Sequence, residues 1–210
     1  MNRDRTKKHW EEVWSQKQPE ETSWHQDQPT ISLAMIEESG LLHSESLIDV
    51  GGGASPLTAR LIEAGHRDIT VLDVSGAALR RAQKRLGPKA EKVEWIEADV
   101  RAVELSRTYA LWHDRAVFHF LTDPVDQARY VRTLECSVQP GARLIIATFA
   151  PGGPRKCSGL DIVQYDARSL QVVLGDHWHL LEEQFEVHRT PAGQEQKFGF
   201  YRFERQNARN

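Results

Sequence analysis

The segment LIDVGGGAS, residues 47–55, decides the fold of this chain. Its first four residues are typical of a buried strand, and its three glycines run directly into a helical pattern at 56–64. Glycine lets the backbone turn sharply and lets a ligand approach where a Cβ would clash. A plain turn between a strand and a helix would use the same glycines, so neighbouring segments must decide whether a ligand binds here.

Strands and helices alternate along the chain on both sides of this turn. The pattern predicts strands at 46–50, 69–73, 93–97, 109–113 and 142–149, with helices at 56–64, 76–86 and 123–138. Such alternation favours a parallel sheet with helices on both faces. A helix at 166–175 and strands at 178–189 and 196–204 follow, and Thr190-Pro191-Ala192-Gly193 joins the two strands. The sheet should therefore end in an antiparallel hairpin.

Two acidic residues stand at the ends of the second and third strands. Asp73 comes about 20 residues after the glycines, where a carboxylate can accept hydrogen bonds from both hydroxyls of a ribose. Asp99 follows the third strand, where a carboxylate can accept from the exocyclic amine of an adenine. Each acid alone is more often a strand-end or helix-capping residue. Together they line the crevice where parallel sheets bind ligands, and they predict a nucleoside site.

The glycine spacing narrows the choice of nucleotide. A dinucleotide fingerprint has the form Gly-x-Gly-x-x-Gly, and Pro56 stands where its third glycine would fall. A phosphate-binding P-loop needs Gly-Lys-Ser/Thr, which the sequence lacks. The pattern Asp-x-Gly-x-Gly from Asp49, followed by Asp73 and Asp99, resembles the class I S-adenosylmethionine-dependent methyltransferases. The resemblance covers roughly residues 46–149.

This resemblance implies a fold, a cofactor and a set of contacts. It implies an α/β, Rossmann-like sheet of seven mostly parallel strands, with helices on both faces and a C-terminal antiparallel hairpin. The cofactor would be S-adenosylmethionine and the product S-adenosylhomocysteine. The methyltransferase domain would span 46–210, behind an N-terminal helical lid at 1–45. The expected cofactor contacts are Asp49, Gly51, Gly53, Ser55, Asp73, Val74, Asp99, Val100, His113 and Asp114, with Ser55 standing where many members have a third glycine.

The N-terminal segment WEEVWSQKQPEETSWHQ, residues 10–26, resembles the start of small thiol and thiopurine methyltransferases, in which an N-terminal helix closes over the cofactor. A helical pattern at 4–17 puts Trp10 and Trp14 on one face, and a polar stretch at 18–28 carries an exposed Trp24. Aromatic faces attract a sulfonium by cation–π interaction. We predict that Trp14 and Trp24 are lid residues that contact the cofactor, whereas packing on the sheet is the better interpretation for Trp10.

The stretch after the fourth strand holds two histidines that are candidates for catalysis. His113 and Asp114 should end the strand, and His119 should follow one helical turn beyond Arg115. We hypothesise that His113 or His119 faces the methyl acceptor, as a general base or as an orienting hydrogen-bond partner. The alternative is a structural Asp114–Arg115 pair with His119 packed beneath a helix.

The loop at 151–160 follows the fifth strand, where related enzymes build the acceptor pocket. In it, Arg155 would attract an anionic substrate and Cys157 would contact a soft acceptor such as a thiol or metalloid. The alternative is an irregular surface loop with a spare cysteine.

Composition excludes several classes of protein. The 210 residues carry 27 Lys and Arg against 30 Asp and Glu, a net charge of −3, which disfavours nucleic acid as a partner. The longest apolar run is far short of the ~20 residues of a membrane helix, and the N-terminus lacks the apolar core of a signal peptide. Cys136 and Cys157 form neither a disulfide framework nor a zinc site. We expect a cytoplasmic monomer or homodimer with no bound metal and no membrane partner.

The predicted function is methyl transfer to a small-molecule acceptor, for which a thiol or another soft nucleophile is a candidate. A protein lysine N-methyltransferase and a non-catalytic protein that binds S-adenosylmethionine remain alternatives. Many lysine and glutamine enzymes of this fold carry an Asn/Asp-Pro-Pro-Tyr-like motif after the fourth strand, where this chain has His113-Asp114-Arg115-Ala116. The acceptor atom stays open, because fold does not fix function.

Overall fold

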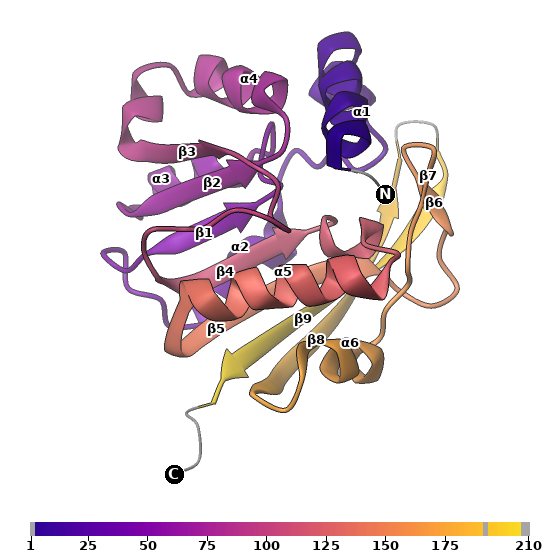
Figure 1. The fold of residues 1–210 in the computed structure, drawn as a ribbon. Helices are drawn as coiled ribbons and strands as arrows, with labels where there is room; N and C mark the ends of the chain where they lie inside the picture. The colour runs from indigo at the N-terminus through magenta and orange to yellow at the C-terminus, as the bar shows by residue number, and fades with distance from the viewer. Residues whose placement is uncertain (1–2, 191–192, 207–210) are drawn as a thin grey trace.

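A seven-stranded sheet runs through the molecule in the order β3-β2-β1-β4-β5-β9-β8 (Figure 1). The computed structural model describes residues 3–190 and 193–206. Neighbouring strands from β3 to β5 pair in parallel, and β9 is antiparallel to both β5 and β8. The strands are β1 (Leu47–Val50), β2 (Ile69–Asp73), β3 (Val93–Glu97), β4 (Tyr109–Arg115), β5 (Val138–Phe149), β8 (Trp178–Arg189) and β9 (Glu195–Arg205). The predicted mostly parallel sheet with a C-terminal antiparallel hairpin is confirmed.

Helices cover both faces of this sheet. They are α1 (Arg3–Gln16), α2 (Thr30–Glu38), α3 (Leu57–Ala64), α4 (Gly76–Leu86), α5 (Pro124–Ser137) and α6 (Ala167–Leu174). Because side chains alternate between the faces of a strand, Ile48 packs in the core on the α5 and α6 side, while Leu47 packs with α2 and α3. Strands covered on both faces need apolar side chains on both, which explains the unbroken apolar runs in the sequence.

The helices begin where capping side chains predict. Ser75 Oγ accepts a hydrogen bond from Ala78 N at the start of α4, at 3.2 Å. Asp123 Oδ1 accepts from Val125 N at 2.8 Å, and Pro124 takes the first position of α5. These side chains satisfy backbone N–H groups that have no partner inside a helix, and so fix where each helix starts.

Two segments differ from the predicted elements. β5 begins at Val138 rather than 142, since a register shift against β4 accommodates Pro140 and Gly141 within the strand. The 151–160 loop is not wholly irregular, because β6 (Lys156–Cys157) and β7 (Leu160–Asp161) pair as a small hairpin. Of the predicted turn at 190–193, Pro191 and Ala192 lie outside the described residues.

The N-terminal helix lies across the end of the sheet, beside α4 (Figure 1). Lys7 Nζ lies 2.5 Å from Glu97 Oε1 of β3, and Arg81 Nη2 of α4 donates to Trp14 O at 3.0 Å. By contrast, α2 packs in the main core through Met35 and Ile36. The division of the chain into a lid at 1–45 and a domain at 46–210 stays a prediction. Within the segment 1–45, α2 shares the core of the sheet.

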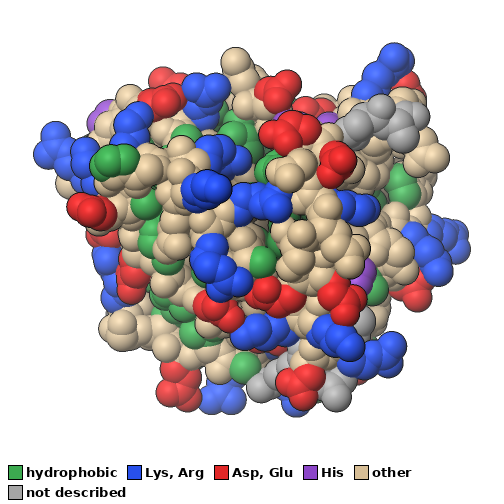
Figure 2. Space-filling view, turned by 90° about the horizontal axis from the view of Figure 1, so that it is seen from above, with side chains coloured by type: hydrophobic (Ala, Val, Ile, Leu, Met, Phe, Trp, Pro, Cys, Tyr) green, Lys and Arg blue, Asp and Glu red, His purple; other side chains and the backbone are tan. Residues whose placement is uncertain are grey.

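Acidic and basic side chains are intermixed on the face that carries α1 (Figure 2). Every helix in the described part of the chain is too short or too polar to cross a bilayer. The cytoplasmic location and the oligomeric state stay predictions.

Candidate functional site

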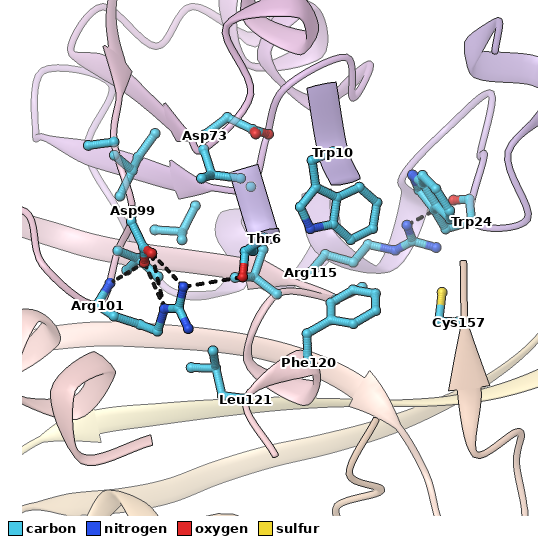
Figure 3. A pocket seen from close by; sticks show the side chains of 18 of the residues that line it. Thr6, Trp10, Trp24, Asp73, Asp99, Arg101, Arg115, Phe120, Leu121 and Cys157 are labelled. Atoms are coloured by element: carbon cyan, nitrogen blue, oxygen red, sulfur yellow. Dashed lines mark hydrogen bonds and ion pairs between the residues drawn. The ribbon is translucent and has the colours of Figure 1, made fainter. Parts of the chain in front are cut away.

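A cavity opens at the carboxyl ends of β1, β2 and β4, with α1 forming part of its wall (Figure 3). α/β sheets bind ligands at this edge. Asp73 and Asp99 lie at one end of the cavity, and Trp24 and Cys157 lie at the other. A smaller cavity adjoins it at the glycine turn, and the side chain of Arg115 lines both.

Asp73 ends β2 and lies in the cavity wall with only 8% of its surface exposed. Its Oδ1 accepts a hydrogen bond from Ser75 N at 2.8 Å. Burial raises the pKa of Asp73 to about 7, and the nearby Asp49 adds to the rise, although bonds from Ser75 and Gly53 oppose it. Hydroxyl groups of a ligand would replace the water that this carboxyl has lost. The site therefore favours a ligand that donates hydrogen bonds here.

The glycine turn brings the backbone close to this acid. Gly51 has a φ of +70°, which side chains rarely adopt, and a Cβ there would run into the side chain of Val117. A Cβ on Gly53 would lie 2.5 Å from Asp73 Oδ2 and 2.8 Å from Ala78 Cβ. Packing alone therefore requires glycine at both positions, and the same lack of a Cβ leaves the backbone open to a ligand.

His113 connects the end of β4 to β1 and α2. Its Nδ1 lies 2.7 Å from Asp49 Oδ1, and its Nε2 lies 2.9 Å from Ser32 Oγ, all three side chains being buried. Both ring nitrogens are thus occupied, so His113 orients Asp49 and has no free nitrogen for a methyl acceptor. Asp49 Oδ2 is buried with no hydrogen-bond partner. An ammonium group of a ligand would satisfy it.

Sequence reasoning missed Ser32, although a signal was present. It is a lone polar residue in the apolar run ISLAMI at 31–36, and a buried hydroxyl needs a partner.

Asp114 and His119 line neither cavity. The Asp114 carboxylate accepts from Val117 N at 2.8 Å and from Tyr130 OH at 2.7 Å, and burial raises its pKa to about 6. His119 is fully buried, and its Nδ1 accepts from Phe149 N at 3.4 Å. Burial, aided by the charge of Arg115, lowers the pKa of His119 to about 3. Asp114 thus holds the loop after β4. His119 lies buried, as in the alternative interpretation in which it packs in the interior and does not face the acceptor.

The Asp114–Arg115 pair of the alternative interpretation does not form, because each side chain has other partners. Asp114 bonds to the loop and to Tyr130, while Arg115 Nη1 donates to Trp24 O at 3.0 Å.

Asp99 lies in the cavity wall with its carboxylate already paired. Its Oδ2 accepts from Arg101 Nη2 at 2.6 Å and its Oδ1 from Arg101 Nε at 2.9 Å. The buried Arg101 also donates to Asp126 Oδ2 at 2.7 Å and to Thr6 Oγ1 of α1 at 3.3 Å. Sequence reasoning missed Arg101, since nothing in the pattern showed that it turns back onto Asp99.

An aromatic wall closes the cavity on the side of α1. The ring centroids of Trp10 and Trp24 are 5.7 Å apart, those of Trp14 and Trp24 are 6.0 Å apart, and those of Trp10 and Phe120 are 5.1 Å apart. Trp24 is half-buried between its two neighbours rather than exposed as predicted. Trp10 lines the cavity with them, so its role is not limited to packing on the sheet.

The two candidates from the 151–160 loop separate in the structure. Cys157 lies in the cavity wall with 4% of its surface exposed, and burial raises its pKa to about 11, so its thiol is neutral at pH 7. Arg155 is exposed and lines neither cavity. The arginines that line the larger cavity are Arg101 and Arg115.

The structure brings most of the predicted site residues to the two cavities. On the larger one lie Trp14, Trp24, Gly51, Asp73, Val74, Asp99, Val100 and Cys157, and on the smaller one lie Asp49, Ser55 and His113, with Trp14, Trp24 and Gly51 shared. Their roles toward a ligand stay predictions. Within residues 3–190 and 193–206, no three His, Cys, Asp or Glu side chains group as metal ligands.

Residues 47–141 match a family model described as a methyltransferase domain, and this segment contains the glycine turn, Asp73 and Asp99. The chain is 30% identical over 81 residues to malonyl-[acyl-carrier protein] O-methyltransferase of Anoxybacillus flavithermus. The matched stretch is 38% of this chain and 30% of that relative, so the chain spans less than half of the relative's length.

Two solved structures share the fold over nearly the whole chain. A SAM-dependent methyltransferase from Anabaena variabilis superposes with a TM-score of 0.77 at 13% identity, over 98% of this chain and 96% of its own. The 1,6-didemethyltoxoflavin-N1-methyltransferase of Burkholderia thailandensis, solved with bound 1,6-didemethyltoxoflavin and S-adenosylhomocysteine, superposes with a TM-score of 0.69 at 17% identity, over 98% of this chain and 87% of its own. At these identities the likeness establishes the fold.

Proposed function

We propose that this chain transfers a methyl group from S-adenosylmethionine to a small-molecule acceptor. Its residues 47–141 match the methyltransferase family model, and its fold is that of a class I S-adenosylmethionine-dependent methyltransferase. One observation carries the proposal: the glycine turn and the buried Asp73 meet at the wall of one cavity, at the carboxyl ends of the strands. The closer resemblance to thiol and thiopurine enzymes stays a prediction.

The cavity residues fit the parts of this cofactor. Asp73 would accept from the ribose hydroxyls, and Val100 would contact the adenine. A carboxylate offers about four lone-pair sites, so Asp99 would accept the adenine amine while it stays paired with Arg101. The unpartnered Asp49 Oδ2 would accept from the ammonium group of the methionine end.

The chain's contribution to the reaction is position and exclusion of water. The cofactor supplies a methyl group on a sulfonium, so neither a metal nor a covalent nucleophile is required. Trp10, Trp14 and Trp24 would face this cation and keep water away from it. The acceptor has to lie in line with the sulfur–methyl bond, where a displacement of about 1 Å costs a factor near 100.

The residues that line the larger cavity favour an acceptor that needs little help from a base. His113 has both ring nitrogens occupied, His119 lies outside the lining, and Cys157 is held neutral. A thiol that ionises near neutral pH fits this environment. The roof formed by α1 and the Trp24 segment favours a small acceptor over the side chain of a folded protein.

The first test is binding. S-adenosylmethionine and S-adenosylhomocysteine are titrated calorimetrically into the wild type, into Asp73→Ala, and into Asp176→Ala as a matched control, since Asp176 is exposed and lines neither cavity. Loss of a charged hydrogen bond costs about 1.5–3 kcal/mol. We therefore expect Asp73→Ala to weaken both ligands roughly 10- to 100-fold, and Asp176→Ala to leave them unchanged.

The second test is turnover, measured as transfer of labelled methyl from S-adenosylmethionine to pools of thiols, acids and amines, and to extract proteins. Labelling of proteins but not of small molecules would replace this proposal with the lysine alternative. Binding without any transfer would favour the non-catalytic alternative, and a wild type that binds neither ligand would remove the proposal.

A further inference from the structure

Arg115 carries its guanidinium to the end of the cavity that lies opposite Asp73 and Asp99 (Figure 3). Its Nη1 donates to Trp24 O at 3.0 Å, and its Cζ lies 5.0 Å from the centre of the Phe198 ring. Its Nε and Nη2 atoms are buried and have no hydrogen-bond partner. These two atoms form one edge of the guanidinium, with two N–H groups side by side.

No carboxylate among residues 3–190 and 193–206 lies within ion-pair distance of this guanidinium. Glu186 and Asp49 act on its charge only from farther away, and burial lowers its pKa to about 10, so it remains charged at pH 7. A cation whose N–H groups are buried and unsatisfied destabilises the folded state. A sulfonium in the same cavity would add a second positive charge. Both costs fall when an anion lies beside Arg115.

We propose that Arg115 anchors an anionic group, a carboxylate or an oxyanion of similar shape, on the methyl acceptor. This inference rests on the proposed function, because it names the class of acceptor that the same cavity takes. The free edge of Arg115 matches two carboxylate oxygens, which a guanidinium binds through two parallel N–H···O bonds.

The surroundings define the rest of the acceptor. Trp10, Trp24 and Phe120 form an aromatic wall beside Arg115, and Cys157 adds a neutral thiol. This environment suits an acceptor with a flat apolar body and one acidic group. The free edge is shielded from water, so the anion reaches it through a shift of the guanidinium or of the Trp24 backbone that it holds.

The experiment uses two probes with the same body and different charge. Phenylacetate and phenylacetamide are titrated into the full chain saturated with S-adenosylhomocysteine. We expect phenylacetate to bind at least tenfold more tightly, and Arg115→Met to reduce its affinity to that of the amide. Arg115→Lys should not restore it, because an ammonium lacks the paired N–H edge. Arg155→Met is the matched control and should change nothing.

A second pair of probes tests the other source of a carboxylate, the methionine end of the cofactor. S-adenosylhomocysteine carries this group and 5′-methylthioadenosine lacks it. If Arg115→Met weakens the former tenfold and spares the latter, Arg115 binds the cofactor and the acceptor proposal is overturned. Equal binding of phenylacetate and its amide by the wild type overturns it too. A wild type that fails to bind S-adenosylhomocysteine refutes the proposed function instead.

A spectroscopic readout covers the case in which Arg115→Met fails to fold. The ¹⁵Nε–H signal of Arg115 is assigned in the wild type saturated with S-adenosylhomocysteine. Addition of phenylacetate should shift this signal and slow its exchange with water, whereas phenylacetamide should do neither. An unchanged signal in both cases would contradict the proposal.

Discussion

The end of the cavity that holds Asp73 and Asp99 is built from consecutive strand ends, whereas the end that holds Arg115 is assembled from distant parts of the chain. The first needs only β1, β2, β3 and the turns that follow them. The second takes Trp10 from α1, Trp24 from the segment after it, Arg115 from β4, and Cys157 from β6.

This difference separates residues whose positions are fixed by the register of the sheet from residues whose positions depend on the packing of other elements. Strand ends are placed by register, in which Asp49 pairs with His113 and Asp73 with Glu97, and a chain that forms the sheet must put them there. The Arg115 end exists only when α1 and the small β6–β7 hairpin have docked. We therefore expect substitutions at the first end to weaken cofactor binding, and substitutions at the second to change which acceptor is bound.

The largest effect is expected from Gly53→Ala. The added Cβ would lie 2.5 Å from Asp73 Oδ2, so it displaces the carboxylate that should accept the ribose hydroxyls. Calorimetry should show S-adenosylhomocysteine bound about 100-fold more weakly, or about 2.7 kcal/mol. Gly175→Ala is the control for a destabilised fold alone, because its φ of +87° strains an alanine while its Cβ would lie in open space, and Gly175 lines neither cavity. Affinity within threefold of the wild type would show that the turn does not approach the ligand.

A different effect, on stability rather than on ligand affinity, is expected in the pH dependence of the ligand-free protein. Burial raises the pKa of Asp73 from 3.8 to about 7, so between these values the folded state holds a proton that the unfolded state has released. The free energy of unfolding should therefore fall as pH rises from about 4 to 7, by on the order of 1.4 kcal/mol per pH unit for one group.

Urea denaturation at pH 5, 6, 7 and 8 measures this change in the wild type, Asp73→Asn and Asp176→Asn. Asp73→Asn lacks the titrating group, so its stability relative to the wild type should increase with pH while its cofactor affinity is reduced. Asp176→Asn should follow the wild type. Parallel curves for the wild type and Asp73→Asn would show that the carboxyl is not held in its neutral form.

The sequence predicted Asp73 and Asp99, which lie at the first end of the cavity, and Trp24 and Cys157, which lie at the second, but it did not predict that Arg115 reaches the second end. The glycine turn, Asp73 and Asp99 lie within one run of strands, where alternation and capping fix the geometry. The residues next to Arg115 in the sequence do not show that Trp24 O will accept a hydrogen bond from its Nη1. They also do not show that its Nε and Nη2 atoms will have no hydrogen-bond partner. The sequence analysis predicted Arg155 as the anion-binding arginine, but Arg155 is exposed. The sequence shows which charged residues a loop carries, but it does not show how far each of them lies from the cavity.

The smallest effect on function is expected from His119→Asn, although sequence reasoning made His119 a candidate base. Its ring is buried against Phe120 and Phe149, outside both cavities. A group whose pKa is lowered to about 3 stays neutral at pH 7 but is a weak base there. Once an acceptor is known, turnover and S-adenosylhomocysteine affinity should remain within about twofold of the wild type. A loss of turnover without a loss of affinity would return His119 to the acceptor site.

The same substitution should change stability in acid instead. The folded state keeps His119 neutral down to about pH 3, whereas an unfolded histidine takes up a proton near pH 6.5. The unfolded state therefore binds more protons between these values, and stability falls as pH drops from 6.5. Asparagine retains an acceptor for Phe149 N but does not titrate, so His119→Asn should lose less stability than the wild type between pH 7 and 5. His177→Asn, at an exposed site, should retain the full acid sensitivity of the wild type. An acid response in His119→Asn equal to that of the wild type would mean that the ring is protonated in the fold, and would reopen its role as a proton carrier.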